Sequence, residues 1–267
     1  MDMRDSVVII TGASAGLGEA TARLFASEGA RVALAARSAD TLNRLAAALP
    51  GSLAVPTDMC DGAAIARMVA RVHAHYGRID LLINNAGQAS SDPVEHVDVA
   101  RYRALMDLNL YGPLLAMQAV IPLMRAQGGG LIFNISTALT KLPMHLPGLG
   151  VYVSTKYALN ALTLTARAEL AADNIRIGVI YPGLMTTAFG THAPTAATSW
   201  PGAPTGAPEA SWSGAPASRP PGAPAPETPE AVAALILDAV RHEPAELDAH
   251  RAFPGAAPRG ADVASHT

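Results

Sequence analysis

Tyr152 and Lys156 are the two residues whose types and spacing best suit proton transfer. They stand four positions apart in a predicted helix, which places them on one face. A free phenol titrates at about pH 10, and a nearby ammonium is expected to stabilise the phenolate and lower that pKa. The pair predicts a group that gives a proton to a carbonyl oxygen or takes one from an alcohol. Taken alone, such a pair is more often surface decoration, so the surrounding elements must decide.

A neutral hydroxyl that could bind the same substrate oxygen comes from Ser136 or Thr137, at the end of the apolar run Leu131–Ile135. Consecutive strand residues point to opposite faces, so only one of the two should face the site.

A glycine-rich turn, TGASAGLG, occupies residues 11–18 between the first predicted strand and a helix. Glycines allow a tight turn and a close approach of backbone to phosphate, and the free N–H groups at the helix start bind the anion. In a strand–turn–helix context, this turn predicts a dinucleotide site.

The second strand ends in Ala36, Arg37 and Ser38. An NAD-binding unit usually has a carboxylate here for the adenosine ribose hydroxyls. Arg37 can pair with a 2′-phosphate instead, and no carboxylate repels it. The alternative is a solvated surface arginine. We therefore expect NADP(H) in preference to NAD(H).

Short apolar runs alternate with amphipathic stretches along the chain. Strands are predicted at Ser6–Ile10, Arg31–Ala35, Leu53–Pro56, Leu81–Asn84, Leu131–Ile135 and Ile175–Ile180. Helices are predicted at Gly18–Glu28, Asp40–Ala48, Ala63–His75, Val99–Arg125, Val151–Ala172 and from Pro229 to about Arg241. This alternation predicts an α/β fold of one domain, a doubly wound parallel sheet of the Rossmann type.

Residue composition divides the chain into four parts. Residues 1–190 form the predicted dinucleotide-binding and catalytic core, and 191–226 a Pro/Ala/Gly-rich flexible substrate loop. Residues 227–254 carry a helix that completes the domain, and 255–267 a disordered tail. Trp200 and Trp212 could anchor the loop over an apolar pocket or simply lie in a tolerated insertion.

The glycine turn, the Asn84–Gly87 run and the Tyr152/Lys156 pair together resemble the short-chain dehydrogenase/reductase family over residues 6 to about 190. The resemblance implies roles position by position. Cofactor contacts fall on Thr11, Gly12, Ser14, Gly16, Leu17, Gly18, Asp58, Met59, Asn85, Ala86, Gly87, Tyr152, Lys156, Pro182, Gly183 and Thr187, beside the Arg37 and Ser38 already named. Asn109 matches a helix asparagine that supports a proton-relay water, and Lys156 also holds the nicotinamide ribose.

Each of these matches has a plainer reading. Asn84, Asn85 and Gly87 could merely end a strand, Pro182–Gly183 could be any turn, and Asp58 could cap a helix. All fall at strand carboxyl ends, however, where open parallel sheets bind ligands.

One departure from the family concerns the hydroxyl residue. The family's usual gap to the tyrosine is thirteen positions, whereas Thr137 precedes Tyr152 by fifteen and Ser136 by sixteen. We infer a two-residue insertion within 138–151, and we favour Thr137 as the catalytic hydroxyl, with Ser136 as the alternative.

Composition excludes several other classes of function. The net charge is −3, which gives no reason to expect a nucleic-acid partner. The single cysteine, Cys60, cannot form an internal disulfide, which fits a cytoplasmic protein, and it is expected to be a small buried hydrophobe. The scattered histidines predict no metal site. Leu108–Met124 is apolar but contains two prolines, which favours a buried helix over membrane insertion.

The sequence therefore predicts an oxidoreductase that transfers hydride between NADP(H) and a carbonyl or secondary alcohol of a small, largely apolar substrate. Pro143, Pro147 and the leucines of 142–149 suggest the apolar pocket. A cofactor-binding regulator without turnover, or an isomerase or dehydratase on the same scaffold, are the alternatives. The family likeness implies a homodimer or homotetramer built on the Val99–Arg125 and Val151–Ala172 helices.

Overall fold

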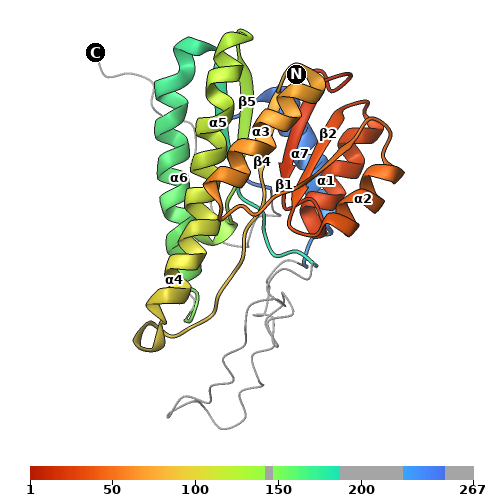
Figure 1. The fold of residues 1–267 in the computed structure, drawn as a ribbon. Helices are drawn as coiled ribbons and strands as arrows, with labels where there is room; N and C mark the ends of the chain where they lie inside the picture. Colours follow the sequence, from red (N-terminus) through yellow and green to blue (C-terminus); the bar gives the residue numbers. More distant parts are fainter. Residues whose placement is uncertain (142–146, 187–224, 250–267) are drawn as a thin grey trace, which may run out of the picture.

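Seven parallel strands form one sheet in the computed structural model, which describes residues 1–141, 147–186 and 225–249 (Figure 1). Their spatial order is β3-β2-β1-β4-β5-β6-β7. The strands are β1 (Val7–Thr11), β2 (Arg31–Ala36), β3 (Leu53–Pro56), β4 (Leu81–Asn84), β5 (Gly130–Ile135), β6 (Ile175–Ile180) and β7 (Glu246–Leu247). The order reverses between β1 and β4, so the predicted doubly wound sheet is confirmed.

Burial explains why these short runs become strands. All five residues of β1 and all four of β4 are buried, as expected for strands covered on both faces. The six predicted strands match the observed ones to within one residue at each end. The strand β7 was not predicted, because two residues are too short to show a period of two.

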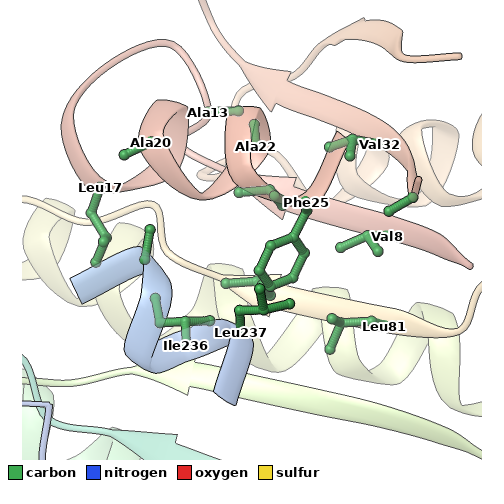
Figure 2. Close-up of a cluster of buried hydrophobic side chains, with 14 of the residues drawn as sticks. Val8, Ala13, Leu17, Ala20, Ala22, Phe25, Val32, Leu81, Ile236 and Leu237 are labelled. Atoms are coloured by element: carbon green, nitrogen blue, oxygen red, sulfur yellow. The ribbon is translucent and has the colours of Figure 1, made fainter. Parts of the chain in front are cut away.

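Helices cover both faces of the sheet. They are α1 (Gly16–Ser27), α2 (Ala39–Ala48), α3 (Gly62–Tyr76), α4 (Val99–Met106), α5 (Gly112–Ala126), α6 (Gly150–Leu170) and α7 (Pro229–His242). α1, α2 and α7 contribute to the apolar core on one face, and α3 and α5 to the core on the other, where α6 also packs. Figure 2 shows the first core, where Phe25 of α1 points between Leu237 of α7 and Val8 and Leu81 of the sheet.

The predicted helix Val99–Arg125 is helical over its whole length, but a π-helical turn at Asp107–Tyr111 divides it into α4 and α5, which the sequence did not predict. Gly112, at the start of α5, lies close to the backbone of Met59. A Cβ built at Gly112 would lie 2.5 Å from the Met59 carbonyl oxygen, so glycine permits this approach. Extra residues in a π turn re-aim the side chains that it carries, and such turns are frequent at functional sites.

Among the described helices, the stretch Val99–Ala126 alone has the length and apolar composition of a membrane span. In the fold it contains the π turn, and Ala116, Met117 and Val120 of α5 are buried in the core shared with α3 and the sheet. Core helices pass the same test of length and composition, so the stretch is weak evidence for a membrane.

Two expectations of the sequence concern chain ends and loops. The predicted substrate loop with Trp200 and Trp212 and the predicted tail lie almost entirely outside the described residues, as does Thr187. The described residues on either side of residues 187–224 lie side by side: Met185 forms a parallel bridge with Glu227, and Thr186 N donates to the Glu227 carbonyl at 3.0 Å.

The expectation of a buried cysteine is wrong, since Cys60 is exposed. In the turn after β3 the neighbouring Met59 takes the buried position, at 4% exposure, and Cys60 faces outward.

Candidate active site

Every described residue predicted to act in the site lies in or beside the segments that follow the carboxyl ends of the strands. Because the sheet is parallel, these segments share one edge. The turn after β1 carries the glycines, β2 ends at Arg37 and β3 at Asp58. β4 is followed by Asn85–Gly87, β5 by Ser136 and Thr137, and β6 by Tyr181, Pro182 and Gly183.

The glycine turn and the Asn85–Ala86 segment interlock. Thr11 Oγ1 accepts hydrogen bonds from the backbone N–H groups of Asn85 and Ala86, both at 3.0 Å, and Asn85 Nδ2 donates to the Thr11 carbonyl at 2.9 Å. A Cβ at Gly12 would lie 2.9 Å from Ala86 Cα, and one at Gly18 would lie 2.3 Å from the Gly12 carbonyl oxygen. Only glycine fits these two positions.

The start of α1 fits a phosphate group. Ala15, its N-cap residue, has no side chain that could accept from the first N–H groups of the helix, and Gly16 has a φ of +55°. Uncapped N–H groups and the positive end of the helix attract an anion. Together with the close turn, this arrangement suits the pyrophosphate of a dinucleotide, with Ser14 and Leu17 in the same turn.

The end of β2 carries an arginine and no carboxylate. Ala36 is buried and brings no carboxylate, while Arg37 and Ser38 are exposed. Within the described part of the chain Arg37 forms no ion pair. Ser38 Oγ donates to Thr41 Oγ1 at 3.0 Å rather than capping α2.

Asp58 is not the cap of the following helix. Its Oδ1 accepts from the Cys60 N–H at 2.9 Å, and Asp61 caps α3 by accepting from Ala63 N. The plainer reading of Asp58 as a helix cap is therefore wrong, and its exposed carboxylate lies at the edge where the family's adenine contact is expected.

Tyr152 and Lys156 are both buried in the first turns of α6, at 7% and 4% exposure. Lys156 Nζ donates to the Ile135 carbonyl at 2.9 Å, which ties the helix to the end of β5. The Thr137 side chain hydrogen bonds to Tyr152. The two side chains are therefore buried at the sheet edge, and the alternative that they are exposed surface residues is wrong.

Burial dominates the ionisation of both groups. It raises the pKa of Tyr152 to about 12, and the hydrogen bond from Thr137 acts against this by favouring the phenolate. Burial also lowers the pKa of Lys156 to about 8. Desolvation is the largest influence on the tyrosine pKa, and the Lys156 ammonium is directed to the Ile135 carbonyl. That Lys156 lowers the tyrosine pKa stays a prediction.

Thr137 and Ser136 follow β5 directly. Their side chains occupy different environments, as expected for consecutive residues of an extended chain. Ser136 N donates to the Ile180 carbonyl at 2.8 Å, and Ser136 Oγ is buried without a hydrogen-bond partner. The Thr137 side chain faces Tyr152 and also accepts weakly from Leu139 N, at 3.4 Å. The geometry favours Thr137 as the hydroxyl beside the tyrosine.

Asn109, in the π turn, is fully buried and holds the segment after β4. Its Oδ1 accepts from Gln88 N at 2.9 Å, and its Nδ2 donates to the Gln88 carbonyl and to Thr155 Oγ1. A Cβ at Gly87 would lie 3.2 Å from Asn109 Oδ1 and 3.5 Å from Lys156 Nζ, so Gly87 separates the two side chains. Asn109 therefore fixes both Gln88 and α6; the relay water beside it stays a prediction.

The sequence reading missed two groups of side chains near this edge. Asn84, Asn134 and Thr163 form a buried hydrogen-bonded chain. Lys141 forms ion pairs with Glu246 at 2.8 Å and Asp248 at 3.0 Å and lies over the Tyr181 ring. The partners are far apart in the sequence, so no local spacing could have revealed either group.

The strand order and the glycine turn after β1 define a dinucleotide-binding protein of the Rossmann type. The chain belongs to the short-chain dehydrogenase family: the model of that family, described as short chain dehydrogenase, matches residues 6–197. Curated proteins of several Staphylococcus strains that resemble the chain carry only the general name oxidoreductase.

Three solved structures illustrate the likeness. A short-chain dehydrogenase from Streptomyces avermitilis is 31% identical, covers 91% of this chain and 88% of its own, and superposes with a TM-score of 0.77. A 3-ketoacyl-(acyl-carrier-protein) reductase from Brucella melitensis, complexed with NADH, is 28% identical, with coverages of 72% and 80% and a TM-score of 0.68. An L-sorbose reductase from Gluconobacter frateurii, complexed with NADPH and L-sorbose, is 33% identical, with coverages of 70% and 73% and a TM-score of 0.65.

Proposed function

We propose that this oxidoreductase interconverts a carbonyl and a secondary alcohol on a largely apolar substrate, with NADP(H) as cofactor and Tyr152 as the acid/base. The observation that carries the proposal is the buried Tyr152, hydrogen-bonded by Thr137 and sharing α6 with Lys156, at the same sheet edge as the phosphate-binding turn.

The chain's own residues handle the proton. In reduction, Tyr152 donates the proton to the carbonyl oxygen, and in oxidation it removes one from the alcohol. Thr137 donates to the tyrosine oxygen and steadies the phenolate that forms. Lys156, whose pKa is about 8, is charged at neutral pH and favours the same negative charge. The bound cofactor supplies or accepts the hydride.

The preference for NADP(H) rests on Arg37. The similar solved structures include one complexed with NADH and one complexed with NADPH, so family membership leaves the choice open. The buried Ala36 in place of a carboxylate and the unpaired guanidinium of Arg37 within the described residues support a 2′-phosphate.

An apolar substrate is supported by the surroundings of the tyrosine. Tyr152 clusters with Ala89, Leu105 and Val151, and Leu139 packs against the same cluster. Residues 142–146 of the predicted pocket lie outside the described chain, whereas Leu149 is buried at 4% exposure.

We infer a homo-oligomer, dimer or tetramer, in which α5 and α6 meet their copies. Large apolar side chains stand exposed on or next to these helices: Tyr111, Leu115, Tyr157 and Leu164. A helix face of this kind is buried in many assemblies. The cytoplasmic location and the absence of nucleic-acid and membrane partners stay predictions from composition.

A substrate panel tests the proposal. The purified protein is given NADPH or NADH with 2-octanone, acetophenone or cyclohexanone, and nicotinamide absorbance and alcohol product are followed together. We expect product and oxidised cofactor in equal amounts, faster with NADPH. Tight NADPH binding without turnover on any ketone would indicate a regulator. Product formed without net cofactor oxidation would indicate an isomerase or dehydratase.

A further inference from the structure

A chain of buried polar side chains runs from the middle of the sheet to the catalytic helix. Asn84 Nδ2 of β4 donates to Asn134 Oδ1 of β5 at 2.8 Å, and Asn134 Nδ2 donates to Thr163 Oγ1 of α6 at 2.8 Å. Thr163 Oγ1 in turn donates to the Leu159 carbonyl at 2.6 Å. Asn134 and Thr163 are fully buried, and Asn84 is 2% exposed.

These amides lie where apolar residues would be expected. Asn134 and Ile132 alternate on β5 and so share one face, and Ile132 belongs to the apolar core beneath α5. Asn134 Nδ2 is 3.4 Å from Met117 Sδ of that core. Replacing both partners of a buried polar pair by apolar groups is often nearly neutral for stability. Folding stability alone therefore does not explain the pair.

The hydrogen bond between Asn134 and Thr163 joins the two elements that carry the proposed proton-transfer groups. Asn134 precedes Ile135, whose carbonyl accepts from Lys156, and stands three residues before Thr137. Thr163 follows Lys156 by seven residues, two turns along the same face of α6. The helix is thus attached to β5 at two levels by directed bonds.

Two hydrogen bonds at different heights along α6 fix the position of the helix along its axis, which apolar packing alone does not fix. Leucine- and valine-type contacts tolerate small slides along a helix axis, because they have no direction. A hydrogen bond weakens steeply when its angle departs from linear. A slide of α6 would strain both the Asn134–Thr163 and the Lys156–Ile135 bonds.

We propose that Asn134 and Thr163 are positioning residues, whose hydrogen bond sets the axial position of α6 on β5 and thereby the contact between Tyr152 and Thr137. The proposal rests on the proposed function of Tyr152 as acid/base. Asn84 supports it by holding the Asn134 amide in one orientation.

Thr163→Val tests the proposal, because valine keeps the shape and removes the hydroxyl. With the fastest alcohol from the panel (2-octanol, 1-phenylethanol or cyclohexanol) and NADP⁺, we expect kcat to fall roughly ten- to hundredfold, as small misplacements of reacting groups do. The acid limb of the pH profile should move to higher pH, because a weaker Thr137 bond leaves the phenolate less stabilised. KM and the NADPH dissociation constant should change by less than about threefold.

Thr163→Ser and Thr21→Val are the matched controls. Serine retains the hydroxyl and should restore the wild-type pH profile despite the lost methyl.

Thr21, on α1, is 1% exposed and makes the same kind of bond, to the Leu17 carbonyl at 2.7 Å, but joins no side-chain network within the described residues. Thr21→Val should cost stability without moving the pH profile. If Thr163→Val is too unstable to assay, Thr163→Ala replaces it.

Two outcomes separate this inference from the proposed function. If Tyr152→Phe is inactive while Thr163→Val behaves like Thr21→Val in kcat and pH profile, the positioning role is wrong and the acid/base assignment stands. If Tyr152→Phe keeps its activity, the proposed function fails first. A shifted profile in Thr163→Val that serine rescues is the expected result.

Discussion

The two halves of the sheet edge hold their functional groups in different ways. The cofactor half, β1 to β3 with α1, relies on backbone shape: Gly12 and Gly18 leave no room for a Cβ, and Thr11 interlocks with the segment after β4. The proposed catalytic half, β4 to β6 with α6, relies on buried polar side chains. Its fully buried polar residues include Asn109, Asn134, Thr155 and Thr163.

This difference follows from what each half must do. A phosphate is bound by N–H groups of the backbone, so side chains there must only leave its space unfilled. In the proposed mechanism a proton is transferred between particular side-chain atoms, so their positions must be fixed by other side chains. The cofactor half should therefore be sensitive to added atoms, and the catalytic half to lost hydrogen bonds.

The largest effect is expected from Tyr152→Phe, which keeps the ring and removes the proton donor. Turnover should fall by about 10²-fold or more, the range of general acid–base catalysis, while NADPH binding is retained. Steady-state rates with the best ketone and NADPH fluorescence titration measure the two quantities. More than about a tenth of the wild-type rate in the variant would contradict the mechanism.

Thr137→Val and Ser136→Ala compare the two neighbouring hydroxyls of the catalytic half. Because the Thr137 side chain contacts Tyr152 and Ser136 Oγ has no partner, the valine variant should lose turnover by roughly tenfold or more and the alanine variant much less. Cofactor affinity should hold in both. The reverse order of kcat values would make Ser136 the catalytic hydroxyl.

Gly18→Ala probes the cofactor half. The added Cβ would lie 2.3 Å from the Gly12 carbonyl oxygen, so the turn must shift and NADPH affinity should fall by about tenfold or more. Gly62→Ala, whose Cβ would meet only the flexible end of Leu115 at 3.3 Å, is the control. Isothermal titration with NADPH compares them; equal affinities would show that the turn is not the phosphate site.

Arg37→Asp should weaken NADPH binding by about tenfold or more, since a hydrogen bond to a charged group contributes roughly 1.5–3 kcal/mol. NADH binding should hold or improve, because the new carboxylate can accept from ribose hydroxyls. The ratio of the two dissociation constants is the measurement. An unchanged ratio would leave Arg37 as a solvated surface residue.

The smallest effect concerns stability against pH in the protein without cofactor. Burial holds the Lys156 pKa near 8, below the ordinary value of 10.5, so the unfolded chain binds more protons between those values. The free energy of unfolding gains a positive contribution from this group as pH rises through that window. Lys156→Met should lack it.

Urea denaturation at a series of pH values measures this difference. For Tyr152, whose pKa of about 12 lies above the ordinary value of 10, the sign is opposite, and its contribution falls above pH 10. Tyr152→Phe should remove that fall. Parallel stability curves for wild type and Lys156→Met between pH 8 and 10 would contradict the buried position of the ammonium.

Much of this molecule can be predicted from the sequence, because the signals are local. The alternation of apolar runs with amphipathic stretches predicts six strands and the parallel sheet, and the glycine turn follows the first of them. The spacing of Tyr152 and Lys156 places both on one face of α6. The gap between Thr137 and Tyr152 favours the hydroxyl whose side chain contacts the tyrosine.

Tertiary structure alone decided the features that depend on contacts distant in sequence. The π turn that aims Asn109 at Gln88 and Thr155 has no periodic signature within an apolar helix. The buried chain links Asn84, Asn134 and Thr163, which lie on three elements far apart in the sequence. The pKa of Tyr152 depends on desolvation more than on its helical neighbour, because burial is set by the whole fold and charge spacing only by one helix.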